Sequence, residues 1–330
     1  MGIGKRITDS TSLASRDGVE EHKVSGQKKE EHQSREKKES KSIVFTPEDP
    51  KYELDDIIVP AYIKEKILDV LEYNTSSRIV FEQWGLNKTH RYSKRIGINL
   101  YGPPGTGKTM AAHAIAKYLG RKIILVNYAD IESKYVGETP KNIRSAFEAA
   151  KETNSILFFD EADAILSRRV TNMTNATDVS VNQTRSVMLM LMNEYQDFII
   201  FATNFIENFD PAFMRRISFH IRFDLPDAEC RDKLWKLYVP PSMPTDLDFD
   251  EITKKYDGIS GSDISNAVLA AAFKAARKRM NVVKKELFFD AVEDILHSKH
   301  ANENKEVTVT KRYVSEDYVK DQLKRQQEVD

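Results

Sequence analysis

The segment Gly102-Pro103-Pro104-Gly105-Thr106-Gly107-Lys108-Thr109 fits the pattern G-x-x-x-x-G-K-[ST] of a phosphate-binding loop. The segment 96–101 before it predicts a short buried strand, and the alanine-rich run from Met110 to Leu119 after it predicts a helix. Glycines let backbone N–H groups converge on an anion without Cβ clashes, and the start of a helix adds its positive dipole end. The sequence therefore predicts a phosphate site. A Gly/Pro turn that matches by chance is the alternative, and the flanking elements argue against it.

This phosphate site is expected to take a nucleotide together with Mg²⁺. Lys108 would reach the β- and γ-phosphates, and Thr109 would hold Mg²⁺. We expect the nucleotide contacts to come from the whole loop and the residue after it: Gly102, Pro103, Pro104, Gly105, Thr106, Gly107, Lys108, Thr109 and Met110.

A second motif follows the apolar run 155–159, whose continuous apolar character predicts a strand buried on both faces. The run ends in Asp160-Glu161-Ala162-Asp163. Ligands of doubly wound sheets bind beyond the carboxyl ends of the strands, so Asp160 should face the phosphate loop. We expect Asp160 to bind Mg²⁺ and Glu161 to act as the general base on the attacking water. An acidic strand end beside a helix start is the alternative explanation of this motif alone.

Polar residues after a later predicted strand and after a short predicted helix extend this site. Asn204 follows the apolar run 198–202, and we expect it to orient the attacking water. Arg215 and Arg216 follow a short helix that begins at Asp210-Pro211. An adjacent arginine pair is normally a solvated surface feature. It would become an arginine finger if a second subunit packed its nucleotide against it.

The order of the elements predicts an α/β fold of the P-loop NTPase type, a doubly wound parallel sheet followed by a small helical lid domain. The remaining predicted strands are 122–127 and 219–223. The other predicted helices of this region are 62–73, 77–84, 140–152 and 181–195, with a polar loop at 170–180. Beyond residue 226 we expect helices at 227–239, 250–256, 262–280, 285–296 and 315–326, a loop at 298–308, and an N-cap at Ser260 or Ser262.

Composition divides the chain into a disordered charged tail (1–42), an α/β nucleotide-binding domain (43–225) and a helical domain (226–330). A tail that recruits a partner is the alternative for 1–42. The net charge of −1 gives no sign of a nucleic acid or a membrane surface as partner, and no apolar run has the length of a membrane span. The N-terminus lacks the apolar core of a signal peptide, so we expect a cytoplasmic protein. Cys230 is the only cysteine, which excludes an internal disulfide.

These motifs resemble, in order, those of the AAA ATPases, especially the meiotic-clade type that includes spastin and katanin. The matching segments are 102–109, 158–163, 202–204, 210–216 and 258–264, and the resemblance covers roughly residues 50–295. The resemblance implies that Gly261 and Ser262 lie near the base and ribose, and that Asp56 and Ile57 hold the adenine. It also implies Mg²⁺-dependent ATP hydrolysis in a homo-oligomer, expected to be a hexameric ring.

The segment 133–138 is similar to the first pore loop of that family, in which an aromatic side chain grips polypeptide in the central channel. Lys134, Tyr135 and Val136 take these positions, and a tyrosine packed on its own domain is the alternative. We therefore expect an ATP-driven protein remodeller. The alternative is an ATP-gated scaffold or assembly switch that threads nothing. Translocation along nucleic acid is a third hypothesis, which the near-zero net charge disfavours.

Overall fold

The computed structural model describes residues 43–90, 95–132, 138–167, 176–204 and 209–303. The predicted tail and the predicted helix at 315–326 lie outside these residues. Among the described residues, no helix is long and apolar enough to cross a membrane.

Five strands form one sheet in the order β2-β3-β4-β1-β5, and every pair of neighbours is parallel. Their bounds are β1 (Ile96–Tyr101), β2 (Ile123–Asn127), β3 (Ile156–Asp160), β4 (Phe198–Thr203) and β5 (Phe219–Arg222). The predicted parallel α/β sheet is confirmed. Because β1 lies between β4 and β5, the phosphate loop leaves the interior of the sheet with a neighbouring strand on each side.

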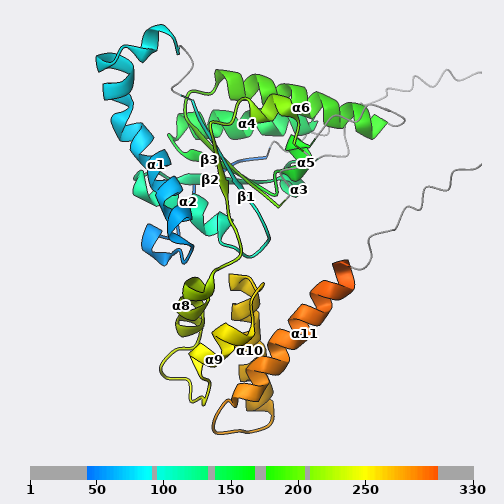
Figure 1. Cartoon of the computed structure of the whole chain (residues 1–330). Coiled ribbons are helices and arrows are strands. Elements are labelled where there is room, and N and C mark those ends of the chain that lie inside the picture. Colours follow the sequence, from blue (N-terminus) through cyan, green and yellow to red (C-terminus); the bar gives the residue numbers. More distant parts are fainter. Residues whose placement is uncertain (1–42, 91–94, 133–137, 168–175, 205–208, 304–330) are drawn as a thin grey trace, which may run out of the picture. The chain divides into compact units, whose positions relative to one another are not determined.

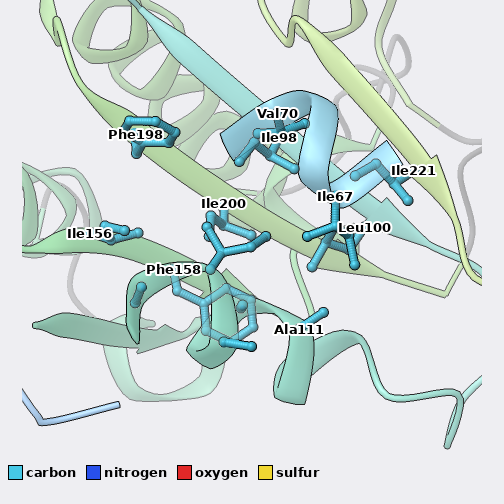
Figure 2. Close-up of a cluster of buried hydrophobic side chains, with 14 of the residues drawn as sticks. Ile67, Val70, Ile98, Leu100, Ala111, Ile156, Phe158, Phe198, Ile200 and Ile221 are labelled. Atoms are coloured by element: carbon cyan, nitrogen blue, oxygen red, sulfur yellow. The ribbon is translucent and has the colours of Figure 1, made fainter. Parts of the chain in front are cut away.

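Helices cover both faces of the sheet, as its two-sided apolar strands require. The helices α1 (Ala61–Arg78) and α2 (Lys108–Tyr118) lie on one side, whereas α4 (Glu138–Glu152) and α6 (Ala176–Glu194) lie on the other (Figure 1). The first face is a cluster of branched aliphatic and alanine side chains around Phe158, and Figure 2 shows it. The second face includes Phe147, Phe159 and Phe201, with the rings of Phe159 and Phe201 stacked 5.5 Å apart.

Short elements complete this part of the chain. They are η1 (Leu54–Asp56), η2 (Ile79–Gln83), η3 (Leu86–Lys88), α3 (Tyr128–Ile131), α5 (Asp163–Leu166) and α7 (Pro211–Met214).

The C-terminal part is helical and has its own core around Trp235 and Phe288, whose rings meet edge to face at 6.5 Å. Its helices are α8 (Ala228–Tyr238), α9 (Phe249–Lys255), α10 (Gly261–Arg277) and α11 (Lys285–Glu303). Ser260 is the N-cap of α10 and forms a capping box with Asp263, which decides between the two predicted caps.

Three helix boundaries differ from the prediction. The predicted helices 62–73 and 77–84 are one element, because α1 continues to Arg78 and passes directly into the π-helical turn η2. The polar run 74–77 does not break the helix. Exposed Thr75 and Ser76 each make helix formation less favourable than alanine would by only about 0.5 kcal/mol. Gly85, with φ +75°, then ends the segment as predicted.

The other two differences are extensions. Helix α6 begins at Ala176, inside the predicted loop 170–180, and the rest of that loop lies outside the described residues. Helix α11 continues through the predicted loop 298–308 as far as Glu303. Lys299 forms an ion pair with Asp263 at the start of α10, and this contact with a distant residue holds the additional turns.

Candidate functional site

A cavity of about 380 Å³ lies where the phosphate loop, the ends of the strands and the C-terminal helices meet. Its wall includes Asp56, Ile57, Pro104, Gly105, Thr106, Gly107, Lys108, Thr109, Met110, Asp160, Glu161, Asn204, Gly261 and Ser262. The structure thus brings together at one cavity most of the residues that the sequence singles out. Gly102 and Pro103 are not in its wall, although the carbonyls of both accept hydrogen bonds from Lys108.

Close backbone packing explains the glycines of the phosphate loop. Gly102 has φ +138°, and a Cβ there would lie 2.1 Å from the carbonyl oxygen of Phe223. Gly105 has φ +75°, and a Cβ there would lie 2.7 Å from Ser260 Oγ and 2.8 Å from Ser262. The N–H of Ser262 also donates to the carbonyl of Gly105 at 3.3 Å. The start of α10 therefore packs directly on the loop.

We expect Gly102→Ala to lower the free energy of unfolding by roughly 2–4 kcal/mol, because it adds backbone strain and a clash with the carbonyl of Phe223, the residue after β5. Chemical denaturation followed by circular dichroism measures this loss. Gly120→Ala is the matched control, since Gly120 also has a positive φ, +64°, but has no atom within 4 Å of an added Cβ. Equal losses in the two variants would contradict the packing explanation.

Lys108 is buried at the first position of α2, with 8% of its surface exposed. Its Nζ donates to the carbonyls of Gly102 and Pro103, both at 2.8 Å, and to Asn204 Oδ1 at 2.9 Å. Burial lowers the pKa of Lys108 to about 8, and the nearby carboxylates of Asp160 and Asp163 oppose this shift. The ammonium is therefore charged at neutral pH and is held at the phosphate loop.

Thr109 and Asp160 are in direct contact across the cavity, with Thr109 Oγ1 donating to Asp160 Oδ2 at 2.9 Å. A hydroxyl and a carboxylate are the hard oxygen donors that Mg²⁺ prefers. Thr109 comes from the first turn of α2, and Asp160 is the last residue of β3. The residues present therefore fit the divalent cation that the sequence predicts.

Glu161 follows Asp160 in an unusual backbone conformation, with φ +50°. Strained conformations of non-glycine residues occur preferentially at functional sites. The Glu161 side chain is exposed and forms part of the cavity wall. The backbone N–H of Glu161 donates to Asp160 Oδ1 at 2.9 Å, which fixes the two acidic residues relative to each other.

Asp163 links this acidic segment to the end of β4. Its carboxylate accepts a hydrogen bond from Thr203 Oγ1 and one from the backbone N–H of Asn204 at 3.3 Å. Asn204 in turn accepts from Lys108. Asp163 belongs to the acidic motif of the sequence, but no role was predicted for it. The spacing Asp-x-x-Asp after a buried strand is the signal that would have directed attention to it.

Arg215 and Arg216 lie away from this cavity. The position that a Cβ of Gly97 would occupy is 3.2 Å from the carbonyl oxygen of Arg216. Gly97 is the second residue of β1, whereas the phosphate loop follows the last one. Along β1, about 16 Å therefore separates Gly97, beside Arg216, from Gly102 at the start of the phosphate loop, at 3.3 Å per residue. Arg216 donates to Asn193 Oδ1 at 2.9 Å and to the carbonyl of Ala212 at 2.8 Å, so it lies at the opposite edge of the sheet from its own chain's cavity.

Some residues of the cavity wall were not predicted. Asp224, Pro226, Leu234, Leu237 and Tyr238 contribute to it from the connection after β5 and from α8. No local pattern marks them, because tertiary structure brings them there: Leu234 of α8 lies beside Gly261 at the start of α10, which packs on the loop. The predicted pore-loop residues Lys134, Tyr135 and Val136 lie outside the described residues. Cys230 is a free cysteine, buried in α8.

Comparisons with known proteins agree with this geometry. Residues 98–225 match the family described as "ATPase family associated with various cellular activities (AAA)". The chain is 33% identical over 261 residues to the proteasome-activating nucleotidase of Methanopyrus kandleri, covering 76% of this chain and 58% of the relative. It is 34% identical over 252 residues to the 26S proteasome regulatory subunit 8 homolog of Schizosaccharomyces pombe, covering 73% and 60%.

A third relative, the 26S proteasome subunit RPT4 of Saccharomyces cerevisiae, is 32% identical over 242 residues, covering 71% of this chain and 54% of the relative. The chain thus spans less than two thirds of the length of the relatives it matches. The family matches the resemblance expected from the motifs, but these relatives are proteasomal ATPases and do not point to the spastin and katanin clade specifically. The parallel sheet, the phosphate loop after its interior strand β1 and the matching segment together show that this chain carries an AAA ATPase domain.

Proposed function

We propose that the chain hydrolyses ATP in the cavity between the phosphate loop and the C-terminal helices, and that it does so within an oligomeric ring. The observation that carries this proposal is the contact network of Lys108, Asn204, Thr109 and Asp160 on one cavity, with exposed Glu161 beside it. This arrangement provides a cation for the phosphates, oxygen ligands for a metal and a free carboxylate for a water molecule.

Each proposed role follows from the position of its side chain. Lys108 exchanges its loop carbonyls for the β- and γ-phosphate oxygens of ATP. Thr109 and Asp160 would hold Mg²⁺, and the ion would supply positive charge that neutralises the phosphates. Glu161 takes a proton from water as the water oxygen attacks the γ-phosphorus, and the bond from that phosphorus to the β-phosphate oxygen breaks to release ADP and phosphate. Asn204 orients the water, and the segment at Asp56 and Ile57 contacts the adenine.

The position of the arginine pair supports action between subunits. Arg216 lies at the edge of the sheet opposite its own cavity, so it is placed to meet the nucleotide of a neighbouring copy rather than its own. In that place Arg215 and Arg216 would stabilise the charge that develops on the transferred phosphoryl group. A homo-oligomeric ring, expected to have six members, satisfies this requirement at every site.

Mixing two inactive variants tests this arrangement. Arg216→Ala keeps its own site but supplies no arginine, whereas Glu161→Gln supplies the arginine but has no base. We expect each variant alone to lose at least about 99% of its ATPase activity, given the 10³–10⁵-fold effect of arginine fingers. Mixed rings should recover a readily measured part of the activity. Failure of the mixture to exceed the sum of its components would contradict action in trans.

We further propose that the ring acts on polypeptide. Two observations support this: the names of the relatives refer to the proteasome, and the sequence around Tyr135 is similar to an aromatic pore loop. The test uses Glu161→Gln, which should hold ATP without hydrolysing it, and a dye-labelled unfolded casein as the probe. We expect casein to bind the ATP-loaded variant and to bind at least about tenfold more weakly when Tyr135→Ala is added, because an aromatic ring provides sequence-tolerant contact area.

The matched control for this test is Tyr118→Ala, since Tyr118 is an exposed tyrosine on α2, 56% accessible. It should leave casein binding unchanged. Equal casein binding with and without Tyr135, or none at all, would favour the alternative of an ATP-gated scaffold that threads nothing.

A further inference from the structure

The arginine pair follows α7, a helix of only four residues. A helix this short is not stable by itself, so its position depends on the contacts that its surroundings make with it. Phe213 and Ile217 are buried and anchor its apolar side. Gly97 lacks a side chain exactly where the backbone of Arg216 and Ile217 rests on β1, within about 3.2 Å of an added Cβ.

The N-terminal end of α7 is fixed by an ion pair. Asp210 is the N-cap: its Oδ1 accepts from the N–H of Ala212 at 2.8 Å. Its Oδ2 accepts from Arg185 Nη2 at 2.9 Å. Arg185 comes from α6 and is almost completely buried, with 1% of its surface exposed. Because the cap and the ion pair use different oxygens of one carboxylate, Arg185 fixes where α7 begins.

The C-terminal end of α7 is fixed from the sheet. The imidazole of His220, on β5, is partly buried beside the backbone of Met214 and of Ile217; burial lowers its pKa, and these two backbone neighbours oppose the shift. These two residues flank Arg215 and Arg216 directly. Nδ1 of His220 is buried without a partner among the described residues, so Nε2 is the ring nitrogen left to face this backbone. His220 therefore holds the turn that carries the arginine pair.

We propose that Arg185 and His220 are positioning residues for Arg215 and Arg216, one at each end of α7. This inference rests on the proposed action of the arginines in trans. A buried arginine–carboxylate pair contributes little net stability to a core, because removing both charges from water costs free energy. Well-packed apolar residues of similar volume often stabilise a core as well or better. Its value here is the register that it imposes on α7. Displacement of a catalytic group by about 1 Å costs on the order of 10² in rate.

The consequence is a defect of one particular kind. A subunit with a displaced α7 keeps its own nucleotide site but presents a misplaced arginine to its neighbour. The test variant is Arg185→Met, which removes the charge and keeps much of the volume. We expect a kcat at least about tenfold lower in homogeneous rings, with the dissociation constant for ATP unchanged. Addition of Glu161→Gln subunits, which carry intact arginines, should restore activity. Addition of Arg216→Ala subunits should not.

Two further variants keep the test decisive if Arg185→Met folds poorly. The double variant Arg185→Met with Asp210→Ser retains a hydroxyl cap but lacks the ion pair, and His220→Leu removes the contact at the other end. Both should give the same pattern of restoration. His220→Gln, whose amide offers a donor near the position of Nε2, should recover most of the activity that His220→Leu loses.

Arg121→Met is the matched control. It also removes an arginine–aspartate pair, from Arg121 Nη1 to Asp197 Oδ1 at 2.6 Å, but in the described part of the chain neither residue forms a hydrogen bond with α7. It should lower the melting temperature without producing the restoration pattern. The reference experiment is restoration of Arg216→Ala activity by Glu161→Gln subunits, which upholds action in trans. If that restoration is seen, the inference is overturned by full activity of Arg185→Met, or by a loss of activity that Glu161→Gln subunits do not restore. If the mixture of Arg216→Ala and Glu161→Gln subunits shows no restored ATPase activity, the proposed action in trans is wrong, and this inference is wrong as well.

Discussion

Glu161→Gln should bind ATP as tightly as the unchanged protein and hydrolyse it about 10²–10⁴ times more slowly, the usual range for loss of a general base. Glutamine has nearly the same size as glutamate but cannot accept the proton of the attacking water. Because the Glu161 side chain is exposed, its replacement removes no buried contact. Steady-state phosphate release gives kcat, and equilibrium binding of a fluorescent ATP analogue gives the affinity.

Glu152→Gln is the control for this prediction, since Glu152 is an exposed residue at the end of α4 and does not form part of the cavity wall. The control should keep normal kcat and affinity. If Glu161→Gln retained more than about a tenth of the activity, a different residue would have to supply the base.

Lys108→Met should weaken ATP binding by roughly 10²-fold, because it removes charge-assisted hydrogen bonds worth about 1.5–3 kcal/mol each. The stability of the protein should not fall in parallel. Burial lowers the pKa of Lys108 to about 8, which means that the fold carries this charge at a cost. A methionine keeps the aliphatic stem and removes the desolvated ammonium, so we expect a melting temperature equal to or above that of the unchanged protein.

Lys117→Met provides the matched control, since Lys117 is on the same helix but is exposed and pairs with Glu53 at 2.8 Å. It should leave ATP binding unaltered. A large drop in melting temperature for Lys108→Met would mean that Lys108 maintains the fold. Its effect on binding would then be indirect.

The sheet was predictable because its signals are local. The run 198–202, which forms most of β4, is apolar without interruption, and strands buried on both faces require this. The helix ends were less predictable, because contacts with distant residues set them. Nothing near Lys299 in the sequence announces its ion pair with Asp263, 36 residues earlier, yet that pair accompanies the extension of α11.

The candidate site follows the same division. Residues in compact motifs, such as Lys108 and Asp160, could be proposed from the sequence because the spacing carries the chemistry. Tyr238 and Asp224 could not, since they reach the cavity only through the packing of α8 and the connection after β5. The contacts of Arg185 and His220 with α7 depend on tertiary structure in the same way, as neither residue belongs to a recognisable motif.

The separation of Arg216 from its own cavity, by nearly the full length of β1, has a consequence for cellular control. Under the proposed arrangement an isolated copy of the chain lacks the arginine pair that its nucleotide site needs. ATP turnover per copy therefore rises with the concentration of the protein, because more copies are assembled. Dilution then acts as an off switch that needs no inhibitor, and a cell could prevent wasteful consumption of ATP simply by keeping synthesis below the threshold for assembly.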